Sequence, residues 1–142
     1  MSVVQTETIR KEVLVDFEPS AAFELFTDGI AKWWPVRTHS YGGEKVTSVV
    51  FETHVGGRVY EVTPEGEQEW ARVRELEPPN RFLLEWLIGS ACGSEVEVTF
   101  APEGPGTRVV LEHRGLEDAA ARGNYDGGWD VVLAPFVDAT RS

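Results

Sequence analysis

Hydrophobic and polar residues alternate with a period of two along most of this chain, which is the pattern of half-buried β-strands. The alternation is clearest near the end, where Val96, Val98 and Phe100 alternate with polar residues and Val109 and Leu111 repeat the pattern. We therefore expect a sheet with one dry face and one wet face. The alternation predicts seven strands, over residues 9–17, 45–53, 57–63, 67–76, 81–87, 95–101 and 107–114.

The same alternation predicts which side chains point inward. In residues 67–76 it is ambiguous, because Trp70 and Arg72 share one side while Ala71 and Val73 share the other. For the other strands the predicted inward side chains are Arg58, Tyr60, Val62, Phe82, Leu84, Trp86, Val96, Val98, Phe100, Val109, Leu111 and His113.

Short turn-forming segments separate the strands. Gly56 and Gly57 allow positive φ, and Pro78 and Pro79 fix φ and withhold N–H donors, so the chain must reverse at both places. Links this short join antiparallel neighbours, which predicts an antiparallel meander. The strands after these turns carry large aromatic residues, and we expect a curved sheet whose inner face is lined by rings.

Helical spacing occurs in two other segments. Pro19 suits a first helical turn, and Phe23, Phe26 and Ile30 follow it, which predicts one or two short helices that end near residues 33–35. The last segment carries an apolar stripe at i, i+3, i+4, i+7 and i+8, and this stripe suits a helix lying across the dry face of a sheet. The residues of the stripe are Trp129, Val132, Leu133, Phe136 and Val137.

The C-terminal helix is weak by intrinsic propensity. Gly123, Gly127 and Gly128 each cost about 1 kcal/mol relative to alanine, and Pro135 removes an internal hydrogen bond and should kink the helix. Its order must therefore depend on packing, so we expect it to serve as a brace and as a lid that can loosen.

Composition narrows the class of protein. The chain has 142 residues, which suits one domain, and 24 acidic against 13 basic residues give a formal charge of −11. This charge repels nucleic acids and anionic membrane surfaces. No run approaches the length of a membrane span, and the single cysteine, Cys92, excludes an internal disulfide. We expect a cytoplasmic protein.

An ordered set of short motifs runs through nearly the whole chain. They are Ile9-Arg10-Lys11, Ala22-Phe23-Glu24-Leu25-Phe26-Thr27, Trp33-Trp34-Pro35, Val55-Gly56-Gly57-Arg58, Glu77-Pro78-Pro79-Asn80-Arg81-Phe82, Val98-Thr99-Phe100, Gly106-Thr107-Arg108, His113-Arg114-Gly115-Leu116 and Gly128-Trp129. In this order they resemble the bacterial family related to the C-terminal domain of the activator of the heat-shock-protein-90 ATPase, in the START-like (SRPBCC) superfamily.

This resemblance implies a fold. It is the α+β helix-grip fold of the birch-pollen-allergen-like proteins, in which a curved seven-stranded antiparallel sheet wraps around a long C-terminal helix and two short helices follow the first strand. The resemblance implies a single START-like domain over residues 1–142, with a core of about residues 6–140, and a hydrophobic cavity between the sheet and the last helix. Members of the superfamily bind lipids, hormones or polyketides, act as cyclases or hydrolases, or serve as co-chaperones.

Inward aromatic residues can form either a cavity wall or a plain core. The predicted apolar wall consists of Trp33, Trp34, Phe51, Tyr60, Phe82, Trp86, Val98, Leu111, Trp129, Leu133 and Phe136. The polar groups expected to join them are Arg58, Tyr60 and His113. A buried arginine needs an anionic partner, which a ligand with an acidic group would supply. The alternative is that Arg58 lies at the rim or pairs with Glu52 or Glu61.

Evidence for catalytic or metal chemistry in the sequence is weak. Glu52 and His54 share a strand face and His113 could approach them, but a zinc site needs three converging ligands. Cys92 has no base close by in the sequence. His113 either acts as a general acid or base or is a hydrogen-bonded histidine at the end of its strand. We expect no metal, no cofactor and no defined catalytic residue.

The first functional hypothesis is therefore a binding domain without established catalysis. Its ligand is a hydrophobic small molecule, with or without an acidic group, held between the sheet and the last helix. Two alternatives stay open: a co-chaperone-like module that binds a protein partner, and a small cyclase or hydrolase that uses cavity residues.

Overall fold

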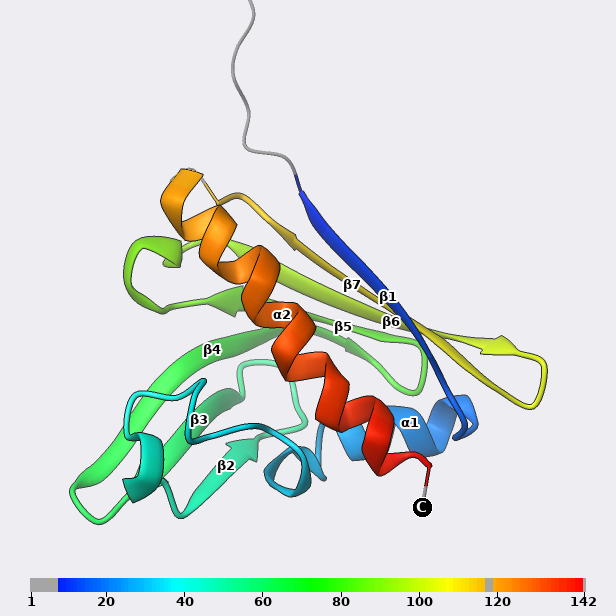
Figure 1. Ribbon diagram of the computed structural model, residues 1–142, viewed down its shortest axis with the longest axis horizontal. Coiled ribbons are helices and arrows are strands. Elements are labelled where there is room, and N and C mark those ends of the chain that lie inside the picture. Colours follow the sequence, from blue (N-terminus) through cyan, green and yellow to red (C-terminus); the bar gives the residue numbers. More distant parts are fainter. Residues whose placement is uncertain (1–7, 117–118, 142) are drawn as a thin grey trace, which may run out of the picture.

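A curved antiparallel sheet with one long helix across its face dominates the computed structural model (Figure 1). The structure describes residues 8–116 and 119–141. The predicted domain boundary near residue 6 lies outside them. The strands are β1 (Ile9–Val15), β2 (Ser48–Phe51), β3 (Arg58–Thr63), β4 (Gly66–Glu77), β5 (Arg81–Trp86), β6 (Glu95–Glu103) and β7 (Gly106–Arg114). The helices are α1 (Pro19–Phe26) and α2 (Ala119–Ala139), with 3₁₀ turns η1 (Ile30–Lys32), η2 (Gly43–Lys45) and η3 (Gly89–Ala91).

The sheet has the order β1-β7-β6-β5-β4-β3-β2 in the described residues. From β2 to β7 each strand pairs with the next, as the short links require, and β1 closes on β7 with Ile9 opposite His113. The predicted meander, seven-stranded sheet and long last helix are confirmed. Of the two short helices, the first is α1 and the second is the single 3₁₀ turn η1.

The Gly56–Gly57 turn is confirmed, and its two glycines have different roles. Gly56 has a φ of 86°, a conformation that other residues rarely adopt. A Cβ atom on Gly57 would lie 2.5 Å from the carbonyl oxygen of Glu52, so this position has no room for a side chain. The turn thereby directs the chain from β2 into β3.

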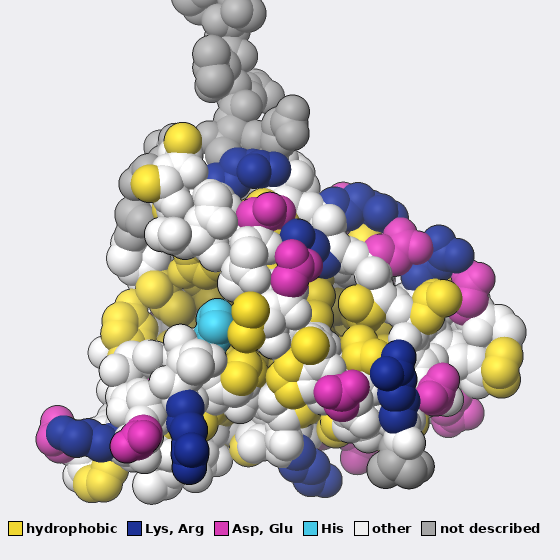
Figure 2. All heavy atoms as spheres, viewed as in Figure 1, with side chains coloured by type: hydrophobic (Ala, Val, Ile, Leu, Met, Phe, Trp, Pro, Cys, Tyr) yellow, Lys and Arg dark blue, Asp and Glu magenta, His cyan; other side chains and the backbone are white. Residues whose placement is uncertain are grey.

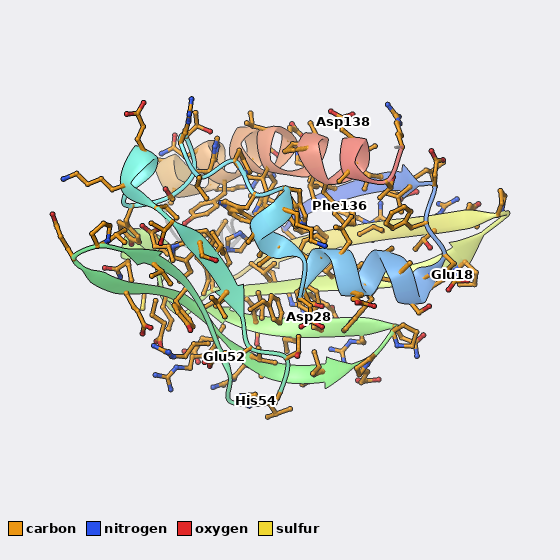
Figure 3. The ribbon with its side chains drawn as sticks, turned by 90° about the horizontal axis from the view of Figure 1, so that it is seen from below. Glu18, Asp28, Glu52, His54, Phe136 and Asp138 are labelled. Carbon is orange, nitrogen blue, oxygen red and sulfur yellow. The ribbon has the colours of Figure 1, made fainter. Side chains whose placement is uncertain are left out.

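The C-terminal half of α2 is packed into the core. Phe136 is fully buried and points from α2 toward the sheet (Figure 3), where its ring centroid lies 5.0 Å from that of Phe26. Phe26 of α1 also contacts Phe82, at 5.5 Å. Burying each phenylalanine stabilises the fold by about 1.5–3 kcal/mol. These rings fill the α1 end of the space between sheet and helix.

The helix α2 is continuous through Pro135. Lys11 of β1 forms ion pairs at 3.1 Å with both Asp126 and Asp130, which fixes the helix beside the edge strand. Among residues 8–116 and 119–141, no helix is long and apolar enough to cross a membrane.

One strand, β4, departs from simple alternation, because its pairings with both neighbouring strands shift register. The pairings of β3 shift between Val59 and Tyr60, and Trp70 and Ala71 of β4 are both buried. The prediction that Arg58, Tyr60 and Val62 point inward is wrong, because Val59 and Glu61 are the buried residues of β3. β3 itself alternates regularly, and the prediction chose the wrong face because the inner face of β3 carries a polar residue, Glu61.

Candidate functional site

A cavity of about 410 Å³ opens between the N-terminal half of α2, the sheet and the loop of residues 33–42 that joins η1 to η2. Hydrophobic side chains gather around a hollow beside α2, with a histidine at its rim (Figure 2). The cavity is lined by Trp34, Thr38, His39, Ser40, Tyr41, Trp70, Trp86, Ile88, Asn124, Tyr125, Gly128, Trp129 and Val132.

Four tryptophan rings form the aromatic wall of the cavity. Trp34 lies in the loop, Trp70 on β4, Trp86 on β5 and Trp129 on α2, so four separate segments each contribute one ring. The centroids of Trp34 and Trp70 are 4.8 Å apart, and those of Trp86 and Trp129 are 5.6 Å apart. We refer to these four residues as the tryptophan wall.

Each indole N–H of the tryptophan wall already donates to a protein acceptor. The acceptors are the His39 carbonyl for Trp34 (2.7 Å), the Glu61 carboxylate for Trp70 (2.7 Å), the Tyr125 hydroxyl for Trp86 (2.8 Å) and His113 Nδ1 for Trp129 (3.0 Å). The orientation of every ring is therefore fixed. A ligand in the cavity can therefore contact the indole rings but cannot accept a hydrogen bond from their N–H groups.

His113 lies behind the tryptophan wall and is fully buried. Its Nδ1 accepts from Trp129, and its Nε2 lies 2.8 Å from the Ser94 hydroxyl. Ser94 in turn donates to the carbonyl oxygen of Ala91 at 2.6 Å. Burial lowers the pKa of His113 to about 4, so the imidazole is neutral near pH 7. Both ring nitrogens are engaged, which confirms the prediction of a hydrogen-bonded histidine at the end of its strand and leaves it no lone pair for acid–base chemistry.

Glu61 is the second buried ionisable residue near the cavity. Its carboxylate accepts from the backbone N–H groups of Tyr41 (2.7 Å) and Gly42 (2.6 Å) and from the indole of Trp70 (2.7 Å). Three donors satisfy a buried carboxylate without a cation. Glu61 therefore ties the 33–42 loop to the sheet and places Tyr41 at the cavity.

Tyr41, Tyr125 and His39 contribute polar rings to the cavity lining, in addition to the polar side chains of Thr38, Ser40 and Asn124. Burial, with the Glu61 carboxylate, raises the pKa of Tyr41, and burial raises that of Tyr125, so both phenols stay protonated at pH 7. His39 Nδ1 lies 2.7 Å from the Thr38 hydroxyl. In the described part of the chain, no residue forms a hydrogen bond with His39 Nε2.

The predicted site residues divide between the cavity and other places. Trp34, Trp86 and Trp129 lie in the cavity wall, and His113 lies directly behind it. Leu133 lines a second groove between β1 and α2. The structure places the remaining inward residues in the packed core, since α1 and η1 cover that end of the sheet; they are Trp33, Phe51, Phe82, Val98, Leu111 and Phe136.

Arg58 and Tyr60 lie on the outer face of the sheet. Arg58 pairs with Glu67 at 3.0 Å and with Glu52 at 3.7 Å, and its guanidinium carbon stands 4.1 Å from the centroid of the Tyr60 ring. The alternative that Arg58 pairs with Glu52 is confirmed. The predicted contact between Arg58 and an acidic ligand inside the cavity is wrong, because the face of β3 was assigned wrongly.

Residues that the sequence did not single out complete the site. Tyr125 precedes Trp129 by one helical turn, and this spacing could have indicated it. His39 and Tyr41 lie in an irregular loop, where no periodicity predicts direction. Glu52 and His54 lie at the edge of the molecule away from α2 (Figure 3). Within residues 8–116 and 119–141, no group of three or more His, Cys, Asp or Glu side chains is placed to hold a metal ion.

Several solved structures share the fold. A solution structure of the Aha1 dimer from Colwellia psychrerythraea has a TM-score of 0.73 at 18% identity, covering 95% of this chain and 96% of that one. The self-sacrificing resistance protein CalC from Micromonospora echinospora has a TM-score of 0.72 at 27% identity, covering 94% and 93%. The anthrahydroquino-γ-pyrone synthase Txn09, complexed with SUM, is 34% identical over 94% of this chain and 97% of its own, with a TM-score of 0.63.

No curated protein matches the chain in sequence. The model of the family described as "Activator of Hsp90 ATPase homolog 1-like protein" matches residues 16–140, which run from the residue after β1 to the end of α2. This match confirms the resemblance carried by the ordered motifs. The chain belongs to the family of activator of Hsp90 ATPase homolog 1-like proteins.

Proposed function

We propose that this protein binds a flat, aromatic small molecule in the cavity between the sheet and α2. The observation that carries the proposal is the tryptophan wall, whose rings are held in place by hydrogen bonds to the protein. Fixed aromatic faces favour flat rings, which can stack on them without ordering either partner. The cavity, at about 410 Å³, has the size of a small-molecule site.

The comparisons support this class of ligand. The relative with 34% identity is named as an anthrahydroquino-γ-pyrone synthase, so its named product contains fused rings. CalC, at 27% identity, is named as a resistance protein. A fused-ring ligand agrees with the aromatic lining of the cavity in this chain.

An acidic group on the ligand is not part of the proposal. Arg58, the residue expected to meet such a group, faces the other side of the sheet. Among the described residues that line the cavity there is neither lysine nor arginine. A carboxylate inside the cavity would have no cationic partner, which is unfavourable, so a charged group on a ligand has to stay in water at the cavity mouth.

Cyclisation of the bound molecule is a second candidate function, and His39 is the observation that favours it. His39 lines the cavity, and its Nε2 has no hydrogen-bond partner among the described residues. At this position it could accept a proton from a phenol of the ligand as the phenol oxygen attacks a ketone. Loss of water from the adduct then yields a pyrone ring, and no oxidant or cofactor is required.

The co-chaperone alternative makes the opposite structural prediction. A module that acts only through its surface has no need of an internal cavity, whereas about 410 Å³ opens beside α2 in this protein. The cavity therefore favours the small-molecule proposal over a protein partner.

Isothermal titration calorimetry tests the proposal directly. We expect anthraquinone-2-sulfonate, a flat tricyclic compound, to bind at least ten times more tightly than palmitate, a flexible chain, because only the flat compound matches the fixed rings. Native mass spectrometry of freshly purified protein would identify any ligand retained from the cell. Equal affinity for the two compounds, or no binding of any flat aromatic compound, would contradict the proposal.

A further inference from the structure

Tyr125 occupies a central position in the cavity. It lies on α2 one turn before Trp129, and its ring centroid is 6.2 Å from that of Trp86 and 4.9 Å from that of His113. The residue is half-buried and lines the cavity. Its side chain is therefore held by aromatic neighbours on the sheet side and open to a ligand on the cavity side.

The hydrogen bond between Trp86 and Tyr125 has only one direction. An indole nitrogen is a donor and never an acceptor, so the Tyr125 oxygen accepts the Trp86 N–H at 2.8 Å. A phenol has one O–H group to donate, and no residue in the described part of the chain accepts it. Accepting from Trp86 also polarises the phenol and strengthens it as a donor.

The other potential donors of the wall are already in use. All four indole N–H groups of the tryptophan wall donate to the protein. Tyr41 is 56% exposed, and Asn124, which also lines the cavity, is exposed too, so water competes for the donors of both side chains. The Tyr125 hydroxyl is therefore the fixed donor on the protected side of the site.

This inference rests on the proposed function. We infer that Tyr125 determines ligand specificity by donating its O–H to a carbonyl oxygen on the edge of a flat aromatic ligand, as a quinone or a pyrone provides. A ligand without an acceptor at this edge displaces water from the hydroxyl and returns no hydrogen bond. Such a ligand binds roughly tenfold more weakly or worse.

Two compounds of nearly the same shape test the inference. Anthraquinone-2-sulfonate carries two carbonyl groups, and anthracene-2-sulfonate has the same three rings and the same charged group without them. We expect calorimetry to show that the wild-type protein prefers the quinone at least tenfold. In Tyr125→Phe, the quinone should lose that advantage while anthracene-2-sulfonate keeps its affinity within about twofold.

A matched control is Tyr60→Phe. It removes a tyrosine hydroxyl from the outer face of the sheet, beside Arg58, and should leave the ratio of the two affinities unchanged. Tyr125→Phe also leaves the Trp86 N–H without its acceptor. A merely structural effect of that loss would weaken both ligands equally, whereas donation to a carbonyl affects the quinone alone.

Infrared spectroscopy of the wild-type complex gives a readout that needs no variant. A quinone carbonyl that accepts from Tyr125 should absorb at lower frequency than in an aprotic solvent. Two results would overturn the inference and leave the proposed function standing. One is equal affinity of the wild type for the two compounds with no shift of the carbonyl absorption, and the other is an unchanged preference for the quinone in Tyr125→Phe. If neither compound binds, the proposed function fails, and the inference fails with it.

Discussion

The indole N–H of Trp129 donates a hydrogen bond to Nδ1 of His113 across 3.0 Å. Since Nδ1 must keep its lone pair to accept this bond, the proton of the neutral ring lies on Nε2 and is donated to Ser94. A buried hydrogen-bond chain thus links α2, β7 and Ser94, the residue that precedes β6. It holds one ring of the cavity wall and requires a neutral imidazole.

Stability should fall in acid because of His113. Burial lowers its pKa to about 4 in the folded chain, against 6.5 for an ordinary histidine. Between pH 6.5 and pH 4 the unfolded chain therefore binds a proton that the folded chain does not. The stabilisation is fully present above pH 6.5, and about 3 kcal/mol is lost by pH 4.

His113→Gln separates this effect from the titration of carboxylates. Glutamine can accept from Trp129 and donate to Ser94, but it does not titrate. Urea unfolding at pH 7 and pH 4 should show that the wild type loses about 3 kcal/mol more than the variant. Equal losses in the two proteins would show that His113 is not the titrating group.

Glu61→Ala should destabilise the protein by about 2–5 kcal/mol, because three N–H donors would lose their acceptor. Hydrogen exchange should accelerate at the amides of Tyr41 and Gly42, since the 33–42 loop would be released. Glu44→Ala, at an exposed position close to this loop, should change stability by less than about 0.5 kcal/mol. Similar unfolding curves for the two variants would refute a tethering role for Glu61.

Arg58→Ala should leave ligand binding unchanged. Its side chain is 33% exposed on the outer face and pairs with carboxylates there, so we expect a loss of less than about 1 kcal/mol in urea unfolding. Trp34→Ala, which removes one ring of the tryptophan wall, should by contrast weaken a flat aromatic ligand at least tenfold. Weaker binding in Arg58→Ala would place this residue in the site after all.

Gly128→Leu should block the cavity. A Cβ atom at Gly128 would lie 3.7 Å from His39 Nε2, so a longer side chain would occupy the space for the ligand. At Gly127, the next residue of α2, an added Cβ meets nothing within 4 Å. Both substitutions remove a helical glycine, which favours the helix by about 1 kcal/mol.

We therefore expect calorimetry with anthraquinone-2-sulfonate to show an affinity at least tenfold lower in Gly128→Leu and unchanged in Gly127→Leu. A loss common to both variants would indicate that the rigidity of α2, and not the occupied space, controls binding.

Alternation along the sequence predicted β5, β6 and β7 correctly, because their pairing is regular and each has a clear dry face. It failed at β3, because the buried face of that strand carries Glu61. It was ambiguous at β4, whose pairing with β3 shifts after Val59 and whose pairing with β5 shifts between Val73 and Glu75. A shift of this kind exchanges the faces of all later residues in a strand. The pattern of hydrophobic and polar residues within one strand does not indicate where such a shift occurs.

The cavity was harder to predict than the fold. The prediction that the side chains of Phe82 and Trp86 point inward was correct. Only Trp86 lines the cavity, however, because α1 fills the space above Phe82. The positions of His39 and Tyr41 depend on Glu61, whose contact with Tyr41 spans 20 residues. Such long-range contacts decide which part of an apolar face stays open.

The crowding of the tryptophans also gives the protein an optical property. The Trp33 ring lies 5.6 Å from that of Trp34, so all five indoles of the chain belong to one connected group of aromatic rings. Excitation absorbed by one indole can pass to its neighbours over such short separations. A bound molecule that absorbs in the near ultraviolet would therefore quench the emission of the whole group, and the intrinsic fluorescence of the unlabelled protein would report occupancy of its cavity.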